Sequence, residues 1–145
     1  MKKKSSLIDP ISINIFNESS HQYIPRQRVI TTLEQLLFIE NFERASVNVI
    51  VMDNDGIQKI NKQYLGHDYP TDVVSFKLED KPFEAEVYIS VEMAKHNAEE
   101  LNTNWREEML RYAIHGVLHT IGYNDSNPEE KKKMQYLETK YLALE

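Results

Sequence analysis

The order of secondary structure near the start of the chain is the strongest constraint on its fold. Residues 11–15 alternate isoleucine with polar residues, and residues 46–52 place valine at every second position. Alternation of this kind is typical of strands with one buried face. Between the two segments, residues 25–38 carry apolar side chains on one helical stripe. A strand, a helix and a second strand in succession predict parallel strands joined by a right-handed crossover.

A second helix and a hairpin are expected next. Asp53 is suited to cap the helix and Gly66 to end it, since glycine adopts the left-handed conformation without steric cost. Residues 73–79 and 85–91 are expected to form the third and fourth strands. The turn around residues 80–82 is short enough for a hairpin, which would make this strand pair antiparallel.

The remainder of the chain is predicted to be helical. A helix from near Ser90 to about Leu101 precedes one that Asn104 and Glu107 would cap reciprocally. Residues 127–130 open the last helix, with proline in its first position. We therefore expect residues 1–145 to form a single α+β domain. It would have a four-stranded mixed sheet, mostly parallel with one antiparallel strand, and about five helices.

The residue pattern at 115–125 predicts a metal site on this C-terminal helical portion. His115 and His119 are four residues apart, so both imidazoles lie on the same face of a helix. Gly122 allows the chain to double back and to bring Asp125 to the same place. Two imidazoles and a carboxylate would hold one zinc ion per chain and leave a fourth position open, as in catalytic zinc sites.

The competing interpretation is that the two histidines are partly buried helix residues satisfied by hydrogen bonds. A histidine pair at this spacing would by itself favour that interpretation. The glycine and the carboxylate at the right offsets favour the metal instead. The surroundings favour it too, because imidazoles buried without partners would be costly among the apolar residues Ile114, Val117, Leu118 and Ile121.

Composition limits the alternatives. The chain has no cysteine, which excludes disulfides and thiolate metal sites and agrees with the cytoplasm. The basic residues 2–4 are not followed by the apolar segment of a signal peptide, and no apolar run is long enough to cross a membrane. The net charge of −6 indicates that contact with nucleic acid would be local. Lys59 and Lys62, or the run 131–133, would be the candidates.

Several motifs together resemble one family, the YbeY family of bacterial rRNA-maturation endoribonucleases. The motifs are His115-Gly116-x-Leu118-His119-x-x-Gly122-Tyr123, Asn61-x-x-Tyr64, the segment Thr-Asp-Val-Val-Ser-Phe at 71–76 and Glu-Val-Tyr-Ile-Ser at 86–90. The resemblance implies a cytoplasmic, zinc-dependent endoribonuclease specific for single-stranded RNA, with no expected role on DNA or membranes. It would act in 16S rRNA 3′-end maturation and ribosome quality control, with rRNA and the small ribosomal subunit as partners.

The chain departs from the usual family pattern at two places. The family generally ends its histidine motif with aspartate and a third histidine, where this chain has Asn124 and Asp125. Asp125 thus occupies the third-ligand position. Many members carry an arginine, implicated in RNA handling, where this chain has Leu65. His67 and Lys62 are the nearby candidates to replace it.

Two other functions are compatible with the residues. The histidine spacing overlaps that of metzincin metalloproteases, but Gly116 stands where those enzymes carry a glutamate general base. A metal-stabilised ribosome-assembly factor without catalytic activity is the second alternative. Thr71, Asp72 and Ser75 are candidates to line a substrate cleft, although loop capping or an outward strand position would explain them equally well. The residues identify no general base.

Overall fold

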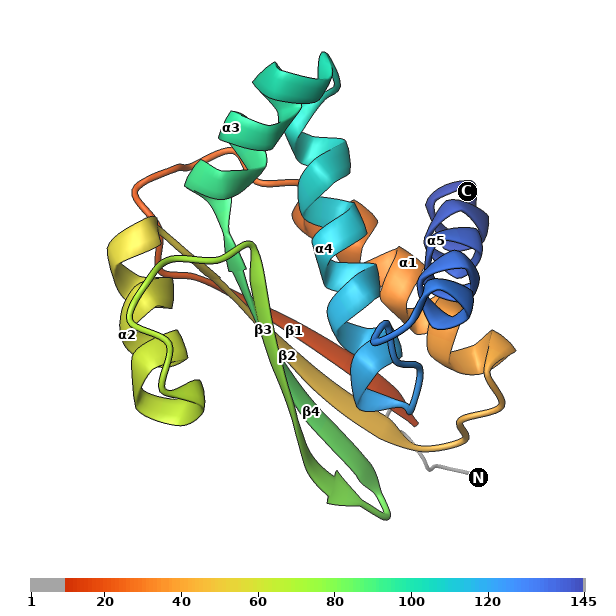
Figure 1. The fold of residues 1–145 in the computed structure, drawn as a ribbon. Helices are drawn as coiled ribbons and strands as arrows, with labels where there is room; N and C mark the ends of the chain where they lie inside the picture. Colours follow the sequence, from red (N-terminus) through yellow and green to blue (C-terminus); the bar gives the residue numbers. More distant parts are fainter. Residues whose placement is uncertain (1–9, 145) are drawn as a thin grey trace.

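Four strands form one mixed sheet in the computed structural model, which describes residues 10–144 (Figure 1). They are arranged in the order β1-β2-β4-β3. Their bounds are β1 (Ile11–Asn17), β2 (Ala45–Met52), β3 (Val73–Asp80) and β4 (Phe83–Ser90). β2 pairs in parallel with β1 and with β4, and β3 pairs antiparallel with β4. The predicted mixed sheet is confirmed, and β4 begins two residues earlier than expected because the turn is shorter.

Five helices within the described residues pack around the sheet. They are α1 (Arg26–Ile39), α2 (Asn54–Leu65), α3 (Val91–Leu101), α4 (Trp105–Thr120) and α5 (Pro128–Leu142). Figure 1 shows α1, α4 and α5 on one side of the sheet and α2 on the other. In the part of the chain that the structure describes, no helix combines the length and the apolar character needed to span a membrane.

The core lies between the sheet and helices α1, α4 and α5. Alternation along the strands sends every second side chain into it, as the sequence pattern requires. The centre of the core consists of residues that are at most 2% exposed. They include Val47, Val49 and Val51 of β2, Ala85, Val87 and Ile89 of β4, Leu33, Leu36 and Leu37 of α1, Leu110, Ile114 and Leu118 of α4, and Tyr141 of α5.

Two of the predicted caps are formed differently from expectation. Asp53 immediately precedes α2, but its carboxylate accepts hydrogen bonds from Ser20 instead of capping the helix, with the backbone N–H at 3.1 Å. The first N–H of α2, that of Asn54, is bound by Glu92 of α3 at 2.6 Å. A distant carboxylate has replaced the local one, because the folded chain brings α3 against the start of α2.

The capping box predicted for α4 is also absent. The Asn104 side chain does cap this helix, but it accepts from the N–H of Arg106 at 2.8 Å instead of that of Glu107. The Glu107 carboxylate turns outward and forms an ion pair with Arg28 of α1. The prediction of Glu107 as a reciprocal cap was therefore wrong, because an interhelical ion pair takes its carboxylate. At α5, Asn127 and Pro128 open the helix as predicted.

Candidate metal centre

A glycine brings α4 close to the sheet directly beside the two histidines. A Cβ atom added to Gly116 would lie 2.6 Å from Cγ1 of Val87 and 3.2 Å from Cγ2 of Val73. Real Cβ atoms essentially never approach this closely, so only glycine fits here at the observed packing distance. The close approach fixes where the last turns of α4 lie over β3 and β4.

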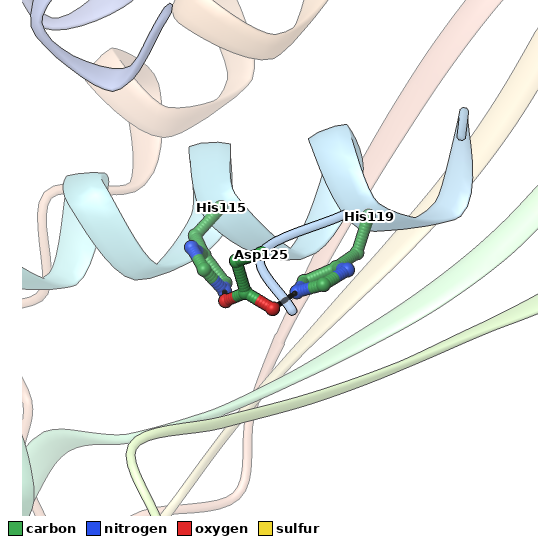
Figure 2. A group of neighbouring side chains, drawn as sticks. All are labelled: His115, His119 and Asp125. Atoms are coloured by element: carbon green, nitrogen blue, oxygen red, sulfur yellow. Dashed lines mark ion pairs between the residues drawn. The ribbon is translucent and has the colours of Figure 1, made fainter. Parts of the chain in front are cut away.

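The turn after α4 carries the third residue of the group. Gly122 has a φ of +117°, which favours glycine, and its N–H donates to the His119 carbonyl at 3.1 Å. The next N–H, of Tyr123, donates to the Leu118 carbonyl at 3.0 Å. These bonds satisfy carbonyls at the end of the helix and reverse the chain. Figure 2 shows that Asp125 is thereby placed between the two imidazole rings.

The geometry of the three side chains fits a divalent metal ion. Asp125 Oδ2 lies 3.5 Å from Nε2 of His115, and its Oδ1 lies 3.4 Å from Nε2 of His119. With metal–ligand bonds of about 2.0–2.1 Å, adjacent ligands of a tetrahedral zinc ion lie about 3.3 Å apart. One ligand atom from each residue lies within 4.8 Å of the other two. The donors are two nitrogens and a carboxylate oxygen, a set well suited to zinc.

Behind His115 lies a buried carboxylate that the sequence interpretation did not identify. Glu138 of α5 is 7% exposed, and its Oε2 lies 2.7 Å from Nδ1 of His115. Its other oxygen accepts from Arg111 at 3.1 Å. Burial by itself lowers the pKa of His115, but the hydrogen bond and charge of Glu138, with the charges of Asp125 and Asp72, outweigh it. The net result is a raised pKa.

A signal for Glu138 was present in the sequence. The buried positions of α5 are Met134, Leu137, Glu138 and Tyr141, which is the spacing of one helical stripe. A carboxylate on an otherwise apolar stripe must find a partner inside the protein. The sequence gives no indication of which partner that is.

A second carboxylate connects the loop that follows α4 to helices α1 and α5. Glu40, which follows α1, accepts hydrogen bonds from the hydroxyl of Tyr123 at 2.8 Å and from that of Tyr141. The hydrogen bond to Glu40 is the main cause of the raised pKa of Tyr123. Since Tyr123 lies only two residues before Asp125, this contact restrains the loop that presents the aspartate.

A cleft of about 480 Å³ opens beside His119. Its walls come from the end of α2, strand β3 and the end of α4. The lining residues are Leu65, Val73, Val74, Ser75, Lys77, His119, Thr120 and Gly122. Ser75, predicted from the sequence as a cleft residue, thus lines the same cleft as His119. Leu65 also contributes to the wall, so the departure from the usual family pattern falls at the cleft itself.

The other predicted substrate residues make local contacts. The Asp72 carboxylate accepts from the N–H of Val73 at 2.8 Å and from the Thr71 hydroxyl at 3.3 Å. The ring of His67 stacks on that of Tyr69, with centroids 5.4 Å apart. These contacts organise the loop between α2 and β3. The predicted role of Thr71, Asp72 and His67 in substrate binding stays a prediction.

The environment of Gly116 also bears on the protease alternative. A metzincin-like glutamate would have to occupy this position, directly after the first histidine. The 2.6 Å approach of Val87 leaves no space for its side chain. The base of that mechanism is therefore missing from the sequence and has no room in the fold.

Comparison with known proteins identifies the family. The sequence model of the family described as Endoribonuclease YbeY matches residues 14–144. The chain is 39% identical over 135 residues to an endoribonuclease YbeY from Chlorobium chlorochromatii, covering 92% of this chain and 86% of the relative. It is 35% identical over 130 residues to the one from Chloroherpeton thalassium, covering 89% and 92%.

A solved structure supports the same assignment at the level of the fold. The solution structure of TM1509 from Thermotoga maritima superposes with a TM-score of 0.65 at 31% sequence identity. The superposition covers 90% of this chain and 86% of that one. The fold agrees with this neighbour, and the sequence matches the family over nearly all of the described residues. The chain belongs to the YbeY family.

Proposed function

We propose that this protein is a zinc-dependent endoribonuclease that cuts single-stranded RNA. One observation supports the proposal above the others: His115, His119 and Asp125 form a compact group of metal donors, and His119 also lines a cleft. The family adds the substrate, because the related proteins are named endoribonucleases. A divalent metal ion at such a site lowers the pKa of a bound water and polarises a phosphoryl oxygen.

We assign metal binding, loop geometry and RNA contacts to different residues. His115, His119 and Asp125 would hold the ion, and Gly122 keeps the loop turned so that the aspartate faces the imidazoles. Ser75 and Lys77 line the same cleft as His119 and would contact the RNA backbone. Thr71, Asp72 and His67 remain candidates for contacts further along the strand.

The first experiment concerns the metal. Protein purified without added metal should contain about one zinc per chain, and His115→Ala or His119→Ala should lose it. Asp125→Asn keeps the size of the side chain but removes its charge, so it should weaken zinc binding strongly. Asp125→His supplies a nitrogen ligand and should preserve binding. If the asparagine variant held zinc as tightly as the wild type, Asp125 would not be a ligand.

The second experiment concerns the reaction. Wild type and a variant with alanine at both 115 and 119, prepared in parallel, should be incubated with unstructured RNA, duplex RNA and casein. Cleavage of unstructured RNA by the wild type alone, abolished by a chelator and restored by zinc, is the expected result. Equal RNA cleavage by both proteins would indicate a contaminant. Metal-dependent cleavage of casein would support a protease, and no cleavage despite bound zinc would support a non-catalytic assembly factor.

The biological context that we propose is 16S rRNA 3′-end maturation and ribosome quality control in the cytoplasm, on the small ribosomal subunit. The net charge of −6 implies few phosphate contacts. Affinity for naked RNA should therefore be modest and should depend only weakly on salt. Specificity would come from docking on the ribosome. A steep salt dependence of RNA binding would contradict this part of the proposal.

A further inference from the structure

Glu138 of α5 contacts the candidate metal centre although it is not one of the three metal donors. Its carboxylate contacts two residues of α4 that are one helical turn apart, His115 through Oε2 and Arg111 through Oε1. The Glu138 side chain is 9% exposed, whereas that of Arg111 is 38% exposed. The contact therefore joins a buried carboxylate, a partly exposed guanidinium and one of the proposed ligands.

Arg111 determines what Glu138 can do to His115. A buried carboxylate needs a compensating charge, and a histidine next to it would ordinarily supply one by becoming an imidazolium. An imidazolium has no lone pair for a metal. Arg111 is always protonated and already provides the positive charge to Glu138. His115 can then be neutral and still donate a hydrogen bond.

The direction of that hydrogen bond decides which nitrogen faces the metal group. When Nδ1 donates to Glu138 at 2.7 Å, the proton of the neutral ring resides on Nδ1. Nε2 is then left with a free lone pair, and it is this atom that lies 3.5 Å from Asp125. The same bond holds the plane of the ring. A carboxylate behind a metal-binding histidine commonly sets its tautomer and orientation in this manner.

We propose that Glu138, with its charge balanced by Arg111, is a positioning residue that fixes His115 as the Nδ1-protonated tautomer and presents Nε2 to the metal. This inference rests on the proposed metal site. It adds a requirement on α5, a helix that supplies none of the three donor side chains. A purely structural role, in which Glu138 only joins α5 to α4, makes different predictions.

The chain offers a matched control in Glu108. Its side chain is also 9% exposed, and it lies 4.0 Å from the same Arg111. Glu108 forms an ion pair with Arg111, whereas Glu138 contacts both Arg111 and His115. Glu138→Gln and Glu108→Gln both remove a buried charge near Arg111. Only the first also removes the carboxylate acceptor of His115.

Zinc affinity, measured by competition with a chelator, should fall about 10–100-fold in Glu138→Gln. It should be unchanged in Glu108→Gln, even if both variants melt at a lower temperature than the wild type. Glu138→Asp keeps the charge at a shorter reach and should recover part of the affinity. Equal zinc affinity in the two glutamine variants would overturn the inference in favour of the structural role.

The tautomer provides a test that needs no metal. Nitrogen-15 spectra of metal-free wild type at alkaline pH, where the imidazole is neutral, should show His115 protonated on Nδ1. In Glu138→Gln the population should shift toward the Nε2-protonated form. Protonation of His115 on Nε2 in the wild type would overturn the inference directly. If the wild type bound no zinc, the proposed function would fail, whereas this measurement would still decide the role of Glu138.

Discussion

The close approach at Gly116 predicts a specific loss of stability in Gly116→Ala. The new Cβ would lie 2.6 Å from Cγ1 of Val87, whereas two carbon atoms pack best at about 3.5–4.0 Å. About 1 Å must therefore open between α4 and β4. Val87 is fully buried and β-branched, so it has little freedom to move aside. The helix itself must shift, together with the two histidines it carries.

Overpacking of this kind costs about 1–3 kcal/mol. Globular proteins have an unfolding entropy of about 2.1 cal/mol/K per residue. For 145 residues, each kcal/mol of lost stability therefore lowers the melting temperature by about 3 °C. We therefore expect the melting temperature of Gly116→Ala to fall by about 3–10 °C. Gly56→Ala in α2 is the control, because its Cβ would meet only Met52, at 3.4 Å. It should be neutral or stabilising by up to about 1 kcal/mol.

A double-mutant cycle tests the cause of the loss. Val87→Ala removes the methyl group that obstructs the new Cβ and should by itself cost about 2 kcal/mol, through lost burial and a cavity. The double variant should lose about 1–2 kcal/mol less stability than the sum of the two single losses, since the new methyl group at position 116 fills the space that Val87→Ala leaves. Chemical denaturation measures all three variants. Strict additivity would refute the steric explanation.

Three further predictions concern the site. Burial lowers the pKa of His115, but Glu138, Asp125 and Asp72 outweigh it, so the folded pKa is raised above 6.5. Protonated His115 therefore stabilises the metal-free protein fully below the pKa of the unfolded chain, and this contribution is lost as the pH rises through the folded pKa. The melting temperature of metal-free protein should therefore fall as the pH rises above the unfolded value of about 6.5, by an amount that His115→Gln abolishes. An equal fall in both proteins would contradict this. In Gly122→Ala the new Cβ would have no neighbouring atom within 4 Å, so the variant should lose stability through backbone strain alone, about 1–3 kcal/mol in chemical denaturation. A variant as stable as the wild type would show that the φ of +117° is not required. Leu65→Arg places a cation in the cleft wall and should strengthen binding of single-stranded RNA while steepening its salt dependence by about one phosphate contact. Lys62→Arg keeps the charge at a residue that does not line the cleft, so this control should change neither property.

Much of the fold and the core of the site could be predicted from the sequence, because the features involved are local. Strand alternation, the helical stripe and the short turn at residues 80–82 depend on neighbours within a few residues, and together they predicted the sheet and its one antiparallel pair. The grouping of His115, His119 and Asp125 spans only eleven positions. It follows from the pitch of a helix and from the turn that Gly122 allows.

Contacts between distant parts of the chain were decided only by the tertiary structure. His115 and Glu138 are 23 residues apart, and Tyr141 and Glu40 are 101 apart. No periodic pattern relates such positions. The same limit explains the failed caps, since the carboxylate that binds the first N–H of α2 belongs to Glu92, 38 residues further along the chain. A side chain's intrinsic preference can be read locally, but its partner is the group that packing brings nearest, and packing involves the whole chain.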